Sequence, residues 1–401
     1  MIIVNRLANM AYVFIVLNII SIMSFSENAN TIFIMYITYL LSGIFMVSAI
    51  LLSGKKVFIN KFHFNLLMWL FFCLASSLWT VNFSNSIASF LTIALSIIYA
   101  FVFYEFIITT RLSIDKFVIA IGTGAIVLGM YALYVYGINT FFNDLISGYR
   151  IGKEISQENS FSYYSAIGFL TWLFWGIQKK NKLFFALALF CFIMLLAGGS
   201  RGSFIASLLC VAIFLFKYNI GRGNRLKSII RLISVLLGLF ILVLIISPYI
   251  LELDIVKRLE LMANILSTSN DTDGSMMVRI GMIQFGFEKF LSSPLIGYGL
   301  DSYGTLYAEF TGWSTYSHNN FIDILVGLGG IGFFLFYINY IVLFCSKRKL
   351  IPVLFCILLF TLLDGFFKPY YQGKLIYILF AGLYYYLDEF EREKDIDEYN
   401  T

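Results

Sequence analysis

The chain has 401 residues, of which 60% are hydrophobic and only 13% are charged, and its formal net charge is +5. No soluble domain of this length covers so much apolar surface with so few charges, so lipid must be the main solvent. The apolar runs are continuous and about 16–25 residues long, which excludes a barrel of short alternating strands. Composition therefore predicts an all-α polytopic membrane protein.

About twelve apolar runs are long enough to be membrane spans. They cover residues 7–25, 31–52, 62–79, 87–108, 117–137, 161–178, 183–198, 202–217, 228–248, 317–344, 351–367 and 374–388. The first run lacks a small-residue cleavage site, so we interpret it as a retained helix rather than a signal peptide. The 5 cysteines lie in or beside these runs without a C-x-x-C pair, which predicts neither disulfides nor a metal site.

Lysine and arginine fall mainly in alternate loops between the predicted spans. The cationic loops contain Lys55, Lys56 and Lys61; Arg111 and Lys116; Lys179, Lys180 and Lys182; Lys217, Arg222, Arg225, Lys227 and Arg231; and Lys347, Arg348 and Lys349. The positive-inside rule makes these loops and both termini cytoplasmic. We expect one integral membrane domain over 1–390, a frayed acidic cytoplasmic tail over 391–401, and long outer loops over 138–160 and 249–316.

The second long outer loop contains a helical pattern. Its apolar positions are Met276, Ile280, Ile283, Phe287 and Phe290. This spacing predicts an amphipathic helix over 275–290 that lies on the outer surface and ends before Pro294, where a glycine-rich turn follows. The preceding "DTD", 271–273, has the D-x-D form of many metal-dependent sugar transferases, but it lies outside and directly before a helix. We therefore interpret Asp273 as a helix cap, and no metal or cofactor is predicted.

Some cations remain on the outer side against the positive-inside bias. They are Arg150, Lys153, Arg201, Arg279, Lys368 and Lys374. Arg201 lies in "AGGSRGSF", a tight turn between two apolar runs, where it opens a helix. A guanidinium beside free helix N-terminal N–H groups is a good phosphate site. A snorkelling arginine, or a salt bridge to a nearby carboxylate, is the alternative.

One of the 2 histidines, His318, begins the apolar run "SHNNFIDILVGLGGIGFFLFY". The positive end of the helix dipole disfavours imidazolium there, so the ring stays neutral and able to act as a general base. The alternative is an interfacial histidine bonded to a backbone carbonyl. Asp323, farther along the same helix, is expected to pair with Arg201 or Arg279, or to orient Asn319 one turn away.

Three segments form an ordered pattern: "GSRGSFIA" opens one helix, "VRIGMIQFGFEKFLSSPLIGYGLDSYG" lies in the large outer loop, and "YSHNNFIDILVGLGGIGFFLF" opens the next helix. They resemble S-R-G/A, R…P-L/F-x-G-x-G and H-N-x-x-L/I in the O-antigen ligase and polymerase superfamily of bacterial envelope proteins. The earlier loop with Arg150 and Asn159 is similar to the family's R-x-x-G…N segment. The resemblance covers residues 145–345 well, and the first half of the chain matches only in hydropathy.

This resemblance implies a GT-C-type, O-antigen ligase-like fold with a large periplasmic loop containing short helices. It implies metal-independent action on undecaprenyl-pyrophosphate-linked oligosaccharides, as donor and acceptor, at the outer face of the inner membrane. His318 would deprotonate the acceptor hydroxyl, which attacks the anomeric carbon with inversion. Arg201 and Arg279 would bind the donor pyrophosphate. The remaining residues expected to bind substrate or support the site are Arg150, Asn159, Asn319, Tyr298 and Asp323, and tyrosines such as Tyr303, Tyr307 and Tyr316, with Trp313, are candidates to stack on sugar rings.

Within the superfamily, "YSHNNFIDIL" and "DGFFKPYYQGK" look more similar to O-antigen or capsule polymerases than to ligases, which transfer the finished chain to lipid A–core. A chain-length regulator and a flippase are expected partners, and nucleic acid is not. A peptidoglycan polymerase uses an acidic residue in a pattern not found here. A lipid-linked-sugar transporter remains an alternative, although its usual internal repeat is not evident. A receptor or scaffold explains none of the outer arginines.

Overall fold

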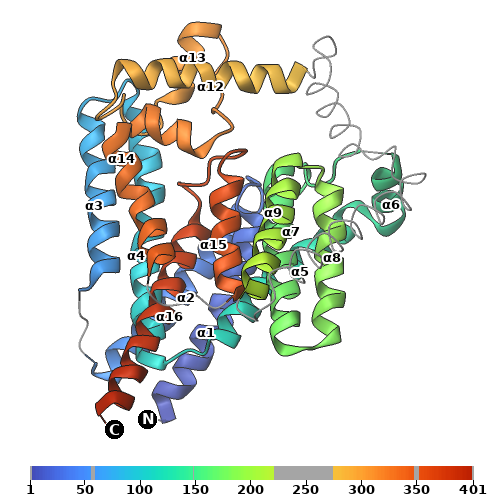
Figure 1. Cartoon of the computed structure of the whole chain (residues 1–401), viewed down its shortest axis with the longest axis vertical. Coiled ribbons are helices and arrows are strands. Elements are labelled where there is room, and N and C mark those ends of the chain that lie inside the picture. Colours follow the sequence, from blue (N-terminus) through green and yellow to red (C-terminus); the bar gives the residue numbers. More distant parts are fainter. Residues whose placement is uncertain (1, 56–58, 148, 221–273, 347–351, 400–401) are drawn as a thin grey trace.

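The computed structural model describes residues 2–55, 59–147, 149–220, 274–346 and 352–399. Within these ranges all regular structure is helical (Figure 1). The helices are α1 (Ile2–Phe25), α2 (Ile32–Ser53), α3 (Lys61–Ala75), η1 (Ser76–Leu78), α4 (Phe83–Thr110), α5 (Ile114–Tyr136), α6 (Ile138–Ser147), α7 (Glu158–Lys179), α8 (Lys182–Gly198), α9 (Arg201–Ile220), α12 (Gly274–Ser292), α13 (Tyr303–Thr311), α14 (Asn320–Cys345), α15 (Pro352–Asp364) and α16 (Lys374–Tyr399).

The predicted spans agree with these helices. Each of them coincides with a described helix except 228–248, which lies outside the described residues. In the described ranges 6 helices are long and apolar enough to cross a membrane, namely α1, α2, α3 with η1, α4, α5 and α14, while α8, α9, α15 and α16 contain shorter apolar stretches. Phe71 and Leu78 are 68% and 87% exposed, as lipid-facing side chains are. The all-helical polytopic class is supported, whereas the total of twelve spans and the GT-C fold stay predictions.

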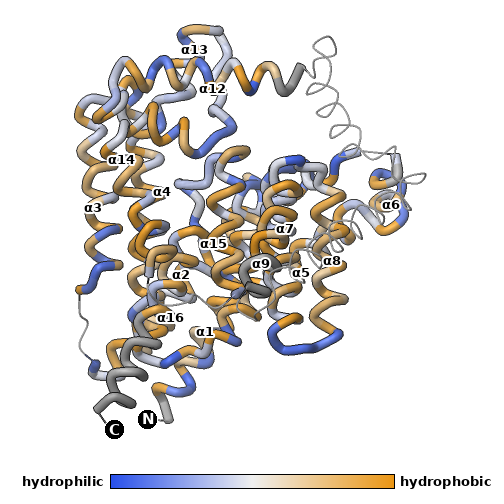
Figure 2. Tube along the Cα trace, viewed as in Figure 1, coloured by the Kyte–Doolittle hydropathy of each residue, from blue (hydrophilic) through white to orange (hydrophobic). Residues whose placement is uncertain are grey.

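The bundle has two different ends. Both chain termini lie at one end, and α12 and α13 lie across the opposite end, called here the far end (Figure 1). Hydrophilic residues gather at the ends, and hydrophobic residues run along the helices between them (Figure 2). At the terminal end the cationic loops meet, because Lys55 Nζ donates to Thr109 O at 2.8 Å and Lys179 pairs with Asp115 at 2.8 Å. The cations over 222–231 and 347–349 lie outside the described residues.

Helix α16 continues to Tyr399, so the described part of the acidic tail is helical, and its cytoplasmic position stays a prediction. The tail sequence "EREKDIDEY" is rich in Glu, Lys and Arg, which have high helix propensity, so the last span propagates into it. The predicted loop 138–160 likewise contains the short helix α6.

Two glycine-rich motifs form a single junction at the far end. Helix α14 breaks at Gly329, whose φ of 62° and ψ of −166° are non-helical. The segment after α12 fills the break, since Gly330 N donates to Pro294 O at 2.8 Å and Tyr298 N donates to Val326 O at 2.9 Å. The "PLIGYG" motif and the glycines of α14 therefore serve one purpose: they fix α12 above α14.

Helix α12 confirms the helix predicted over 275–290, and the proposed cap Asp273 lies outside the described residues. It has two apolar faces. Ile280 and Phe287 of the predicted stripe are 38% and 50% exposed, as an interfacial helix requires. A second face packs on α13 and α14 and forms a small separate core made of Met282, Phe285, Tyr303, Leu306, Tyr307, Ile322 and Val326.

Candidate functional site

Two neighbouring cavities occupy the far end. The larger cavity, of about 370 Å³, is lined by Glu27, Tyr163, Tyr164, Lys368, Gln372 and Lys374 among others. The smaller cavity, of about 210 Å³, shares Asp301, Tyr316, Asp323 and Tyr371 with the larger one. The lining comes mainly from the α1–α2 connection, the start of α7, α13 with the segments on both sides of it, and the α15–α16 connection with the start of α16. Helices α4 and α14 add Asn85 and Asp323. Tyrosine faces and a few polar groups are the usual lining of a site for a polar ring-shaped ligand.

His318 lies beside these cavities in a constrained turn. Its φ is 57°, an uncommon value for a residue other than glycine. The next residue, Asn319, caps α14 by accepting bonds from the backbone N–H groups of Phe321 and Ile322 at 2.9 and 3.1 Å. The His318 ring contacts the Tyr316 ring, with centroids 4.2 Å apart. Its buried Nδ1 has no hydrogen-bond partner within the described ranges, so the carbonyl-bonded alternative is not observed there.

Burial and Arg279 together keep His318 neutral. Burial is the larger cause and the positive charge of Arg279 the smaller one, and they lower the pKa of His318 from 6.5 to about 4. The sequence predicted this direction from the helix dipole, but burial by the neighbouring ring and segments is the main origin. The field of Arg279 also acts on the Tyr316 hydroxyl. Two of the predicted catalytic residues, from α12 and from the α13–α14 connection, are thus brought together.

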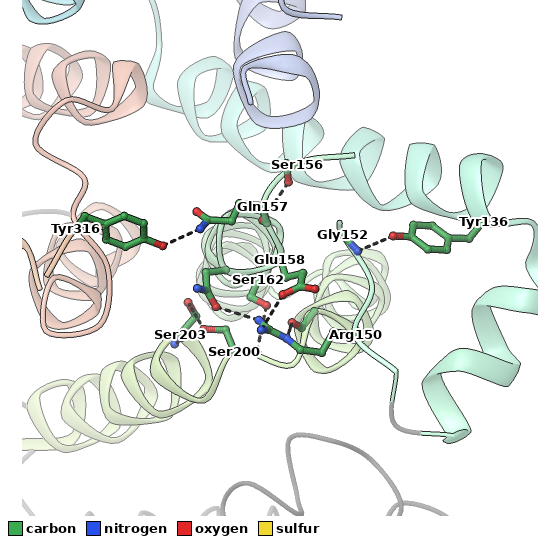
Figure 3. Close-up of polar contacts among 12 residues, drawn as sticks. Tyr136, Arg150, Gly152, Ser156, Gln157, Glu158, Ser162, Ser200, Ser203 and Tyr316 are labelled. Atoms are coloured by element: carbon green, nitrogen blue, oxygen red, sulfur yellow. Dashed lines mark hydrogen bonds and ion pairs between the residues drawn. The ribbon is translucent and has the colours of Figure 1, made fainter. Parts of the chain in front are cut away.

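Arg150 and Asn159 are also brought together by a hydrogen bond. Figure 3 shows Arg150 beside Glu158 at the start of α7. Arg150 pairs with Glu158 at 2.8 Å and donates to Asn159 Oδ1 at 2.9 Å and to Gly198 O at 3.1 Å. The last bond ties Arg150 to the turn before Arg201, which opens α9 as predicted. Since these contacts occupy its guanidinium, Arg150 is well placed to hold the Arg201 turn against α7.

A hydrogen bond links the two halves of the site. Gln157, the residue before α7, donates through Nε2 to the Tyr316 hydroxyl at 2.7 Å (Figure 3). Tyr316 lines both cavities and touches His318, so it connects the His318–Arg279 half with the Arg150–Arg201 half. From the sequence, Tyr316 is one of several aromatic candidates for sugar stacking, and no local signal predicts its bond with Gln157.

Lys368 and Glu27 are site residues that sequence reasoning did not select. Lys368 Nζ lies 3.6 Å from Glu27 Oε1 and contacts the Ser160 hydroxyl. Glu27 also accepts bonds from Ser160 Oγ at 2.5 Å and from Gln157 N at 3.0 Å. Lys368 was recognisable as an outer cation, but its carboxylate partner lies in the first interhelical connection and has no local signal.

The remaining predicted residues take mixed positions. Asp323 lines both cavities and accepts from Ser317 N at 3.1 Å, and within the described ranges it forms no ion pair with Arg201 or Arg279. The Tyr298 side chain packs against the small core and is not among the residues that line either cavity. Among described residues, no group of at least three His, Cys, Asp or Glu side chains is arranged to hold a metal ion.

The adjacent Asn320 organises the α15–α16 connection. Its Oδ1 accepts from the backbone N–H groups of Tyr370 and Tyr371 at 2.7 and 2.9 Å, and its own N–H donates to Gly365 O at 2.7 Å. The "HNN" motif therefore presents the imidazole, caps the helix and holds the Lys368 segment against α14.

The apolar helices and the polar far-end site define a multi-pass membrane protein. A family model described as O-Antigen ligase matches residues 186–337, from within α8 to within α14. This match includes Arg201, Arg279, His318 and the glycine junction. It supports the superfamily that the motifs resemble, and with it a membrane enzyme that handles glycosyl groups. No curated protein matches the chain.

Proposed function

We propose that the chain is a polysaccharide polymerase, which joins undecaprenyl-pyrophosphate-linked oligosaccharide repeats at the outer face of the inner membrane. The observation that carries this proposal is the neutral His318, held beside Arg279 and a tyrosine-lined cavity at the end opposite the termini. The termini and the cationic loops are then cytoplasmic, and the far end is periplasmic.

In this mechanism the acceptor hydroxyl gives its proton to the His318 imidazole while its oxygen attacks the anomeric carbon of the donor. The bond from that carbon to the phosphate oxygen breaks, and its electron pair leaves with undecaprenyl pyrophosphate. Arg279 and Arg201 offset the negative charge that accumulates on the leaving group. The hydroxyl approaches the imidazole past the Tyr316 ring, because Tyr316, and not His318, is among the residues that line the two cavities.

A ligase that transfers the chain to lipid A–core is the second candidate. The matching family model is described as O-Antigen ligase, but the match supports the superfamily and does not distinguish the two reactions. The same base and the same arginines serve both reactions, since only the acceptor differs. A transporter of lipid-linked sugar is a third possibility. It would move its cargo without changing the length of the saccharide.

The test compares surface polysaccharide on gels, and the lipid-linked pool, in a deletion strain carrying wild-type or substituted protein. We expect His318→Ala to reduce transfer by roughly 10²–10⁴-fold. Arg201→Ala and Arg279→Ala should reduce it by roughly 10²–10³-fold each. Lys153→Ala is the matched control, because it removes an exposed outer cation that does not line either cavity.

The products distinguish the candidates. Single repeats on the core with no ladder indicate a polymerase, and bare core with long chains left on the lipid carrier indicates a ligase. Unchanged repeats stranded on the cytoplasmic side indicate a transporter. A normal ladder from all three substituted proteins at normal protein level would refute the proposed site.

A further inference from the structure

The smaller cavity differs from the larger one in charge. Lys368 and Lys374 line the larger cavity, and Lys368 is already paired with Glu27. The lining of the smaller cavity contains two carboxylates, Asp301 and Asp323, and no lysine or arginine. Its other lining groups are Asn85, Gly304, Ser314, Thr315 and the rings of Tyr303, Tyr316 and Tyr371.

Asp301 is held in place from separate parts of the chain. Its backbone has a φ of 59°, which is uncommon outside glycine, asparagine and aspartate. Ser89 Oγ of α4 donates to Asp301 Oδ2 at 2.7 Å, and Gln372 of the α15–α16 connection is a further hydrogen-bond partner. Within the described ranges no cation pairs with Asp301, so its carboxylate faces the cavity with acceptor capacity to spare.

Asp323 reinforces this acceptor character. It is only 8% exposed and accepts from Ser317 N at 3.1 Å, and it also has no cationic partner within the described ranges. A buried carboxylate without a cation needs hydrogen-bond donors from whatever occupies the cavity. Sugar hydroxyl, amide N–H and ammonium groups are such donors, and tyrosine rings suit the C–H faces of a pyranose. An acidic sugar would bring a second anion beside these carboxylates in a cavity whose lining contains no lysine or arginine.

The cavity is also reachable from solvent. Among its lining residues, Asn85 of α4 and Ser314 of the α13–α14 connection are exposed, while Tyr303 and Asp323 are buried. A sugar can therefore enter at the far end without passing between the membrane helices. Tyr316, shared by both cavities and in contact with His318, would then hold this sugar next to the base.

We infer that the smaller cavity holds the acceptor sugar and selects a neutral or amino sugar over an acidic one, with Asp301 as a specificity-determining residue. The acceptor role rests on the proposed function, whereas the sugar preference is a binding property that needs no turnover. The chemistry that supplies this substrate must therefore place an uncharged or ammonium-bearing sugar at the acceptor end of the repeat.

The test measures binding of matched methyl glycosides to the full-length protein in lipid nanodiscs by saturation-transfer NMR. The neutral probes are the methyl glycosides of glucose, galactose and their N-acetylamino forms, and the acidic probes are methyl glucuronide and galacturonide. We expect at least one neutral probe to bind roughly tenfold or more tightly than its uronide, because like charges a few ångströms apart repel strongly. Asp301→Asn should narrow this ratio to within about threefold.

Asp301→Asn keeps an amide oxygen that accepts from Ser89, so the fold is preserved, and thermal unfolding checks this. Glu309→Gln is the matched control, because it removes an exposed carboxylate of α13 outside the cavity and should leave the ratio unchanged. Equal or tighter binding of the uronides, or no binding of any probe, would overturn the inference. His318→Ala should keep the sugar preference while it abolishes transfer, so the inference and the proposed function fail separately.

Discussion

Replacement of Gly329 by alanine tests whether the glycine junction positions the site. A Cβ at Gly329 would lie 2.4 Å from the carbonyl carbon and oxygen of Leu295, which belong to backbone and cannot rotate away. The φ of 62° with ψ of −166° also lies in a region that is essentially reserved for glycine. The backbone strain costs roughly 1–3 kcal/mol, and the forced shift of the Leu295 backbone costs a similar amount. We therefore expect Gly329→Ala to lower the free energy of unfolding by roughly 2–6 kcal/mol.

The assay is unfolding by SDS titration in mixed micelles, together with the polysaccharide ladder in cells. Displacement of the segment after α12 would move Arg279 away from His318, so the ladder should shorten although every predicted catalytic residue is present. Gly281→Ala is the matched control, because it lies in α12 with no atom within 4 Å of a Cβ and should be neutral or slightly stabilising. If Gly329→Ala unfolds within about 0.5 kcal/mol of the wild type, the junction does not depend on this glycine and the reasoning is wrong.

Three further predictions concern ionisation and the polar links of the site. The acid limb of the pH profile of kcat/KM should lie near pH 4 rather than 6.5. The free energy of unfolding should also decrease as the pH falls from 6.5 toward 4, because His318 binds a proton in the unfolded chain before it does so in the folded protein. This decrease should be absent in His318→Gln. Because burial outweighs the arginine field, Tyr316→Ala should move this limb upward more than Arg279→Ala does, and the reverse order would contradict the assigned cause. Lys368→Met should lower the free energy of unfolding by roughly 1 kcal/mol. In a double-mutant cycle, adding Glu27→Gln should restore part of this loss. If the effects of the two substitutions on the free energy of unfolding simply add, Lys368 and Glu27 are not coupled.

Sequence periodicity and hydropathy were sufficient for the membrane class, the positions of the described apolar helices, the helix at α12 and the tight turn before Arg201. These features are local, because lipid selects long apolar runs and a helix face repeats every few residues. The placement of His318 at a helix start and the neutral state of its ring were also accessible from sequence. For the pKa of His318, the sequence indicated only the direction of the shift. The main cause of that shift is burial, which depends on side chains from other segments.

The composition of the cavities was decided by tertiary structure alone. Glu27, Asp301 and Lys368 lie in three separate interhelical connections, and Tyr371 lies in the same connection as Lys368. No local pattern distinguishes these residues from ordinary loop residues. The same holds for the glycine junction, where two motifs that look independent in sequence exchange backbone hydrogen bonds across the break at Gly329. Contacts between distant segments carry no periodic signal, so the chemistry of this site became visible only when the helices had brought those segments to one end of the bundle.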